Sequence, residues 1–267
     1  MYHVGVEFPF AAVISTGGAT ARVATLGNNP DIDTTSQPED VWAGAELGTL
    51  NGVDHRFIPK PQAATSMEAV SDSANDAAAG TGARTILITY LDANYTQKTV
   101  VVTLNGLTPV AIADPIMRIN GLVVVTAGTF GGNNIGNLSI RAAGGLGATY
   151  SYMQAGTGLA RSSMFTVPDK VQMDVMSLLI SINRTDTNAR AATFSLCIQN
   201  SAGRLIKGLE LSCTTDAPYR HESANIPSNV LASRTDIWFR CEAVSISNTN
   251  VTAAVFGYTR NPVNFTL

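Results

Sequence analysis

The residues that come nearest to a ligand-binding pattern form a cluster of oxygen donors at positions 71–76 of this 267-residue chain. Its members are Ser71, Asp72, Ser73, Asn75 and Asp76. Carboxylate, amide and hydroxyl oxygens of this kind suit Ca²⁺. However, the twelve-residue calcium loop, with glycine at its sixth position and glutamate at its twelfth, is absent. Ser, Asn and Asp turns usually satisfy their own backbone amides, so we predict a turn here and no metal ligand.

A glycine-rich step follows at Gly80-Thr81-Gly82, just before a run with strand character. Phosphate-binding loops have the opposite order, because they follow a strand and open a helix. The sequence also lacks the Gly-Lys-Ser/Thr step of a P-loop. We therefore expect a glycine turn that lets Arg84 enter a sheet, and neither a nucleotide nor any other cofactor.

Several acidic residues could supply the paired carboxylates that cleave a glycosidic bond. Such a pair must flank the bond at a defined separation, which a sequence does not show. The candidates are Glu39 with Asp40, Asp72 with Asp76, Asp114 and Asp236. Nothing else in the sequence indicates a hydrolase, so we predict that the protein is not an enzyme.

A nucleophilic pair would require Ser195 or Cys197 close to His221. Polar and apolar residues alternate over positions 194–198, so we expect one of the two nucleophiles to face a core with its apolar neighbours. This alternation favours a strand over a catalytic pair. We accordingly assign no catalytic residue.

Neither the histidines nor the cysteines form a metal-binding pattern. The histidines lie far apart, and none stands at ligand spacing from another His, Cys or Glu. The cysteines are odd in number and widely spaced, which argues against both a zinc site and a disulfide framework. We predict three buried free thiols. The residues concerned are His3, His55, His221, Cys197, Cys213 and Cys241.

The composition favours a protein that binds other proteins. Hydrophobic residues make up 45% and charged residues only 14%, against about 25% charged in typical soluble domains. A formal net charge of -3 gives no reason to expect a nucleic acid or a membrane as partner. Arginine, which is favoured over lysine at interface cores, supplies most of the 17 basic residues. The start lacks signal-peptide features, and no window approaches a membrane span, so we expect folding in a cytoplasm.

Turn and strand signals divide the chain into three regions. Residues 1–65 show little periodicity, and we expect an extended N-terminal arm with a short helix capped by Ser36. Residues 66–160 contain β-branched runs, with a hairpin turn expected at Asn105-Gly106. Residues 161–267 contain further short strands between turn clusters. The prediction is a mainly β protein, with a central antiparallel β domain and a C-terminal jelly-roll-like sandwich.

The expected strands cover residues 84–91, 99–104, 116–125, 135–140, 171–183, 192–199, 204–211, 236–244 and 251–258. We expect residues 161–267 to form an autonomous sandwich. Its predicted core includes Phe194, Leu196, Trp238 and Phe256.

The segment 80–110 resembles a recurrent segment of tailed-bacteriophage virion proteins. There a Ser/Asp-rich turn is followed by a Gly-Thr-Gly-Ala-Arg step, as at residues 80–84, and by an Asn-Gly hairpin, as at residues 105–106. The Pro-Glu-Asp-Val-Trp step at residues 38–42 resembles the opening of the same family. The string 235–240 resembles the penultimate strand of jelly-roll domains in phage virion proteins.

This resemblance implies a non-enzymatic structural component of a virion, assembled in the host cytoplasm. The role expected first is a head decoration, or cement, protein that binds the major capsid protein on the outer capsid. The alternatives are a fibre or adaptor attached to the tail or collar, and, from another class, a glycan-binding module that recognises the host. Self-association, most plausibly as a trimer, is expected because the surface is poor in charge.

Overall fold

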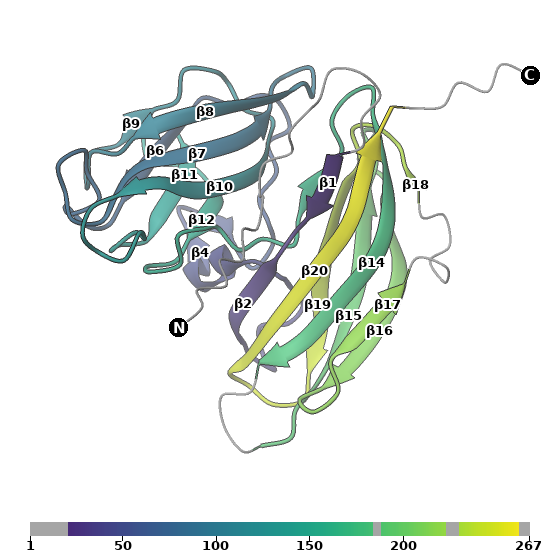
Figure 1. Cartoon of the computed structure of the whole chain (residues 1–267). Coiled ribbons are helices and arrows are strands. Elements are labelled where there is room, and N and C mark those ends of the chain that lie inside the picture. Colours follow the sequence, from purple (N-terminus) through teal and green to yellow (C-terminus); the bar gives the residue numbers. More distant parts are fainter. Residues whose placement is uncertain (1–20, 184–187, 223–229, 262–267) are drawn as a thin grey trace, which may run out of the picture.

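The computed structural model describes residues 21–183, 188–222 and 230–261. In these residues the strands pair antiparallel, which confirms the predicted mainly β fold class. Their only helix is the short 3-10 helix η1 (Ala43–Leu47), and none is long and apolar enough to cross a membrane. Figure 1 shows two lobes side by side, a large sandwich and a smaller β lobe.

The larger lobe is a sandwich of two sheets, which we name after their central strands. The β14 sheet runs in the order β1 (Ala21–Ala24), β20 (Thr249–Arg260), β14 (Gln172–Asn183) and β17 (Tyr219–Glu222), with β2 (Gly27–Ile32) also on β20 and β18 (Val230–Leu231) on β14. The β15 sheet runs in the order β13 (Phe165–Thr166), β19 (Asp236–Val244), β15 (Ala191–Gln199) and β16 (Leu205–Thr214), with β3 (Glu39–Asp40) also on β19.

The sandwich core lies between these two sheets. Phe194 and Leu196 of β15 are buried there, as predicted, together with Leu178 and Ile180 of β14. Because side chains alternate along a strand, every second residue of each long strand contributes to this core.

The smaller lobe also consists of two sheets around a core of its own. The β7 sheet has the order β10 (Arg118–Ala127), β7 (Ala83–Leu91) and β8 (Gln97–Thr103). The β11 sheet has the order β12 (Thr149–Met153), β11 (Leu138–Ala142), β6 (Met67–Ser71) and β9 (Val110–Ala111). A separate hairpin of β4 (Thr49–Leu50) and β5 (Val53–Asp54) lies near η1.

Residues 21–65 do not form the expected irregular arm. β1 and β2 pair with β20, in registers that set Ala21 opposite Thr259 and Gly27 opposite Ala253. β3 pairs with β19. These strands are short, and β2 contains two Asn and a Pro, so their local pattern is weak. Their ladder hydrogen bonds come from partners 200 or more residues away. The expected boundary at residue 65 is therefore wrong, as is a sandwich complete within 161–267. Residues 1–20 lie outside the described residues.

The expected hairpin turn at Asn105-Gly106 is also wrong. β7 and β8 do form a hairpin, but it turns at residues 92–96, where Tyr95 N donates to Asp92 O at 2.9 Å. Gly106 instead lies at a crossing between the two sheets of the smaller lobe. Its backbone N donates to Asp76 O at 2.8 Å, and its carbonyl accepts from Ser71 N at 3.1 Å. Gly106 has a φ of 59°, which glycine adopts readily. Tertiary contacts determine that this conformation occurs at the crossing and not in a hairpin.

No helix begins at Ser36. Its hydroxyl donates to the carboxylate of Glu39, and residues 39–40 continue as β3 against β19. The pairing with β19 supplies hydrogen bonds that an isolated helical turn of this length would not provide.

Candidate functional site

The oxygen cluster at residues 71–76 is a structural turn. Asp76 is fully buried, and its carboxylate accepts four hydrogen bonds of 2.7–2.9 Å. The donors are Ser71 Oγ and the backbone N–H groups of Ala83, Ile135 and Gly136. Asp72 accepts two bonds of 2.8 Å from Asn137. In the described part of the chain, no three His, Cys, Asp or Glu residues are placed to hold a metal ion.

The glycine step before β7 serves this turn. A Cβ on Gly82 would come within 2.1 Å of Asp76 Oδ1, so a larger residue would displace the buried carboxylate. The Gly80 carbonyl accepts a hydrogen bond of 3.0 Å from Arg84 Nε. These contacts explain the glycines at positions 80 and 82, so a bound phosphate is not needed to explain them.

The candidate carboxylates lie in separate environments. Glu39 accepts hydrogen bonds from Asn29 and Ser36, and its burial raises its pKa. Asp114 lies at the surface, where Tyr90 and Lys98 donate to it at 2.8 and 3.2 Å. Asp40 and Asp236 are buried where the two lobes meet. We find no pair of these carboxylates lining the groove described below.

A group of buried and half-buried residues, five of them charged and one a tryptophan, is here called the junction cluster and joins the lobes. Its members are Asp40, Lys60, Arg118, Asp236, Trp238 and Arg240. Asp40 Oδ1 accepts from Trp238 Nε1 at 2.9 Å and from Arg240 Nε at 2.7 Å. Arg118 of the smaller lobe forms an ion pair of 3.1 Å with Asp236 of the sandwich, and their side chains are only 9% and 4% exposed.

Sequence analysis missed Lys60, Arg118 and Arg240 of the junction cluster, and Lys60 has the most unusual surroundings of the three. Its Nζ lies 3.2 Å from the centroid of the Trp238 ring and 3.0 Å from Gln199 Oε1. Burial lowers the pKa of this amine to about 8. An amine of this kind can act as a nucleophile, but Trp238 and Gln199 occupy its surroundings. Its one sequence signal is the pair of flanking prolines, Pro59 and Pro61, in a chain with few lysines.

Trp238 does not lie in the sandwich core where it was predicted. Its neighbours Ile237 and Phe239 point into that core, so alternation turns Trp238 to the other side of the β15 sheet. There it packs with Trp42 and Cys197. The other misplaced core residue, Phe256, is 39% exposed.

The structure does not assemble a nucleophilic pair from the candidate residues. Ser195 and Cys197 lie on β15, both buried, whereas His221 lies on β17 in the opposite sheet and contacts Tyr219 OH at 2.9 Å. His55 is buried against Trp42, its Nε2 accepts from Thr149 N, and burial lowers its pKa. His3 lies outside the described residues.

The predicted buried free thiols are confirmed. Burial raises the pKa of Cys197 and of Cys213 to about 11, and that of Cys241 to about 12. Such thiols carry little thiolate at neutral pH, which makes them poor nucleophiles.

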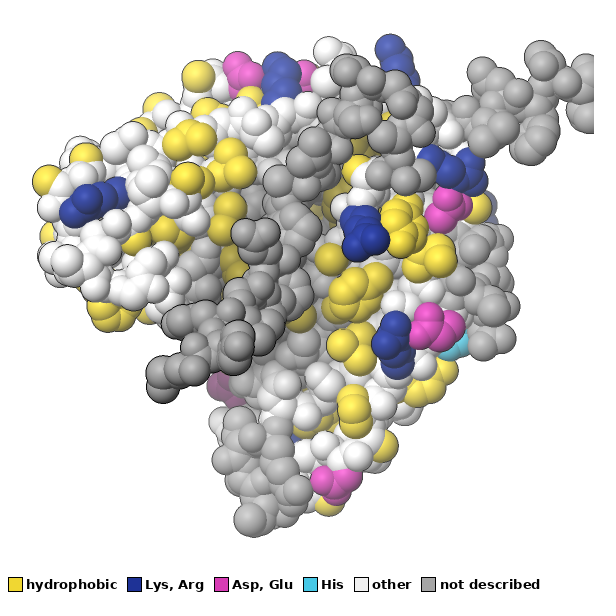
Figure 2. All heavy atoms as spheres, in the orientation of Figure 1, with side chains coloured by type: hydrophobic (Ala, Val, Ile, Leu, Met, Phe, Trp, Pro, Cys, Tyr) yellow, Lys and Arg dark blue, Asp and Glu magenta, His cyan; other side chains and the backbone are white. Residues whose placement is uncertain are grey.

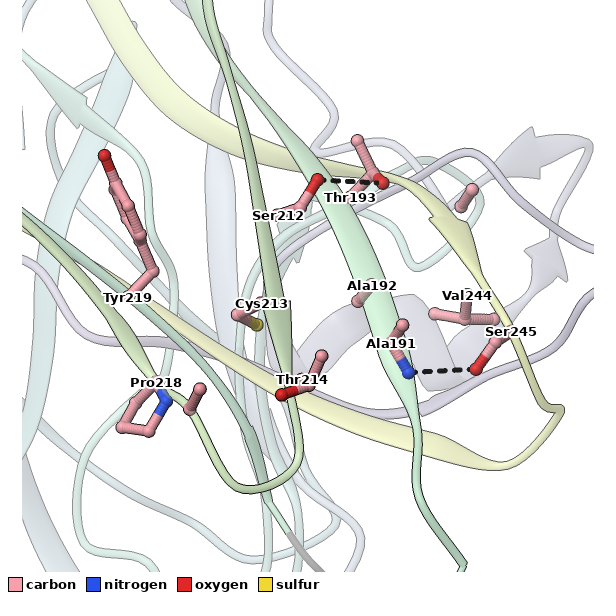
Figure 3. Close-up of a pocket in the computed structure, with 12 residues that line it drawn as sticks. Ala191, Ala192, Thr193, Ser212, Cys213, Thr214, Pro218, Tyr219, Val244 and Ser245 are labelled. Atoms are coloured by element: carbon pink, nitrogen blue, oxygen red, sulfur yellow. Dashed lines mark hydrogen bonds between the residues drawn. The ribbon is translucent and has the colours of Figure 1, made fainter.

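A groove of about 540 Å³ lies at one end of the sandwich (Figure 3). It crosses the ends of β15, β16 and β19 and reaches the turn that leads into β17. Small side chains stand opposite one another there, with Ala192 between Cys213 and Val244 on the adjacent strands. Its twelve lining residues carry no charge: Ala191, Ala192, Thr193, Ser212, Cys213, Thr214, Ala217, Pro218, Tyr219, Ala243, Val244 and Ser245.

Apolar side chains are also exposed on two sheet faces. On the β7 sheet, Leu87 stands between Val101 and Val123, and Val101 is 57% exposed. The neighbouring positions of this face on β7 and β8 are threonines, and on β10 Gly121 lies opposite Thr89. On the β14 sheet, Met176 and Phe256 are about 40% exposed. Figure 2 shows hydrophobic side chains over both lobes, with charged ones mostly in small groups between or beside them.

The comparisons with known proteins give little beyond these observations. No protein-family model matches the chain, and no curated protein matches it in sequence. A crystal structure of the infectious bursal disease virus VP2 subviral particle is 9% identical, with a TM-score of 0.20, over 93% of this chain and 73% of that chain. The structure of the Gx strain of that virus is 7% identical, with a TM-score of 0.19, over 92% and 73%. Scores of this size do not establish a common fold.

Proposed function

We propose that this protein is a non-enzymatic structural component of a tailed-phage virion, most specifically a head decoration protein that binds the outer capsid. The observation that carries the proposal is the uncharged row of Val101, Leu87 and Val123 across three strands of the β7 sheet, in which Val101 is exposed and the other two are half-buried. Contiguous exposed apolar surface on a soluble protein marks a site of contact with another macromolecule.

The use of the charged residues supports the same proposal. The carboxylates of Asp40, Asp76 and Asp236 accept hydrogen bonds that hold loops and lobes together. The resemblance of residues 80–110 to tailed-phage virion proteins then favours the virion as the place of contact, with the major capsid protein and other copies of this chain as partners.

Counting the copies of this chain per particle tests the proposal. Quantitative mass spectrometry of purified particles from the phage that encodes it should give hundreds of copies, as expected for a head decoration. About six to eighteen copies would indicate the tail or collar instead. Absence of the chain from particles would overturn the proposal.

A glycan-binding role is tested in parallel. Such a role requires exposed aromatic rings on loops, and among the described residues Phe130 is the large exposed aromatic in a loop. We expect no binding to, and no cleavage of, capsular or lipopolysaccharide glycans on an array. Measurable cleavage would contradict the non-enzymatic assignment.

A further inference from the structure

The groove in Figure 3 lies beside two strands that end their sheets, β16 and β17. Among the described strands, β16 pairs only with β15, and β17 pairs only with β14. An unpaired edge presents a row of N–H and C=O groups to which an incoming strand can add. The groove next to it is uncharged and lined by small residues, so it suits a strand that brings large apolar side chains.

The first residues of the chain have this character. Apolar residues occupy every second position from 2 to 10, and Glu7 is the one carboxylate among these residues. The apolar members are Tyr2, Val4, Val6, Phe8 and Phe10. A period of two predicts a strand with one wholly apolar face. Three aromatic rings in this segment would complement the Ala, Ser, Thr and Cys side chains of the groove.

We infer that the groove is the docking site for residues 2–10 of a second copy of this chain. The proposal goes beyond the virion role and does not depend on it. It is an instance of strand addition, in which the main-chain ladder supplies affinity and the groove selects the alternate side chains.

The position of the N-terminal segment argues for a second copy over the same copy. Ala21 lies opposite Thr259, near the end of β20, whereas the groove lies where β20 begins, next to Ser245. Twelve residues of β20 separate the two ends, a distance of about 40 Å. β1 and β17 are also on opposite edges of the β14 sheet. The eleven residue steps from Phe10 to Ala21 span at most about 36–40 Å when fully extended, so a path around the sandwich leaves no slack to lay Phe10 in the groove of its own chain.

This contact is of the head-to-tail kind, because the segment and the groove are different surfaces. Head-to-tail contacts close into rings when the rotation between copies permits. A ring of three would reconcile the proposed docking with the trimer proposed from the composition.

Complementation between two variants tests the inference. The first variant lacks residues 2–12 and keeps the groove; the second carries Ala191→Trp, which fills the groove and keeps the segment. We expect the wild type to be an oligomer at micromolar concentration by light scattering, and each variant alone to be a monomer. Mixed in equal amounts, the two should form a complex, because one supplies the segment and the other the groove.

Two further variants keep the test decisive. Ala202→Trp places the same side chain on an exposed residue of the β15–β16 turn, outside the groove, and should leave the oligomer intact. Phe8→Asp with Phe10→Asp should dissociate the oligomer without touching the groove, so it replaces Ala191→Trp as evidence if that variant misfolds. A monomeric wild type, an oligomer that survives both the deletion and the double substitution, or variants that fail to complement would overturn the inference. These outcomes are independent of whether the chain is found on particles.

Discussion

The junction cluster and the groove are opposite in character. The junction cluster gathers carboxylates, guanidinium groups and an amine with a lowered pKa, but neighbouring side chains from both lobes occupy its surroundings. The groove is open, yet its lining contains no charged residue and no histidine. The charged groups of the junction cluster are therefore engaged with one another and with neighbouring side chains, while the groove offers an uncharged surface suited to contact.

The largest expected effect is on the aromatic part of the junction cluster. Trp238→Ala should reduce the free energy of unfolding by about 3–5 kcal/mol, because it leaves a cavity beside Trp42 and removes one of the hydrogen-bond donors to Asp40. Phe256→Ala, at an exposed position of the same lobe, is the control and should have little effect. Urea denaturation followed by circular dichroism measures both. Similar losses in the two variants would mean that Trp238 is not a buried anchor.

A somewhat smaller loss is expected from the ion pair between the lobes. Asp236→Asn should cost about 3 kcal/mol, because it leaves the buried guanidinium of Arg118 without its counter-charge. Asp169→Asn removes the exposed partner of Arg234 and should barely change the melting temperature. Scanning calorimetry distinguishes the two. If Asp236→Asn also separates the transition into two, the lobes unfold independently once the pair is lost.

The effect of Lys60 should depend on pH. Its pKa is lowered to about 8 in the folded protein, whereas an unfolded lysine titrates near 10.5. Between these values the unfolded chain binds more protons, so stability should rise with pH over this window. Below pH 8 the cost of burying the charged amine is fully present. Lys60→Met should remove this rise, and the difference in unfolding free energy between variant and wild type from pH 7 to 9.5 measures it. Parallel pH profiles would contradict the burial of a charged amine.

The smallest effect concerns the thiols, which report directly on access to the groove. Cys213 lines the groove and is 5% exposed, whereas Cys197 and Cys241 are fully buried. Cys213 should therefore be alkylated first in the native protein, although slowly because its pKa is about 11. Deleting residues 2–12 should accelerate this reaction if the segment occupies the groove. Peptide mapping after timed alkylation measures the order, and equal rates at all three cysteines would show that the groove is closed.

The sequence predicts the long strands well and the short ones poorly. β14, β15, β19 and β20 carry enough β-branched and alternating residues to be found from local pattern alone. β1, β2 and β3 were missed because their partners are distant in sequence, so their local pattern is weak. The hairpin turn predicted at Asn105-Gly106 was wrong for a related reason. Gly106 donates its backbone N–H to the carbonyl of Asp76, a contact that is distant in sequence and that no local pattern shows.

The candidate site was predicted only by elimination. The prediction that Asp76 lies in a turn follows from the turn preference of Ser, Asn and Asp. No local pattern shows that the backbone N–H groups of residues 83, 135 and 136 donate to its carboxylate. The groove has no sequence signal either, because it arises where small residues of three strands meet in register. Trp238 was placed on the wrong side of its sheet because alternation gives two faces without saying which core each one meets.

The pairing of β1, β2 and β3 with the last strands has a consequence for synthesis on the ribosome. Asp40 and its partner Arg240 are 200 residues apart, so the first strands emerge long before the strands that complete their sheets. At about 5–20 residues per second, this interval lasts roughly 10–40 s. The smaller lobe, whose strands lie between them, can fold during that time. The nascent chain therefore carries unpaired strands on one side of a finished domain, and the sandwich closes only near the end of translation.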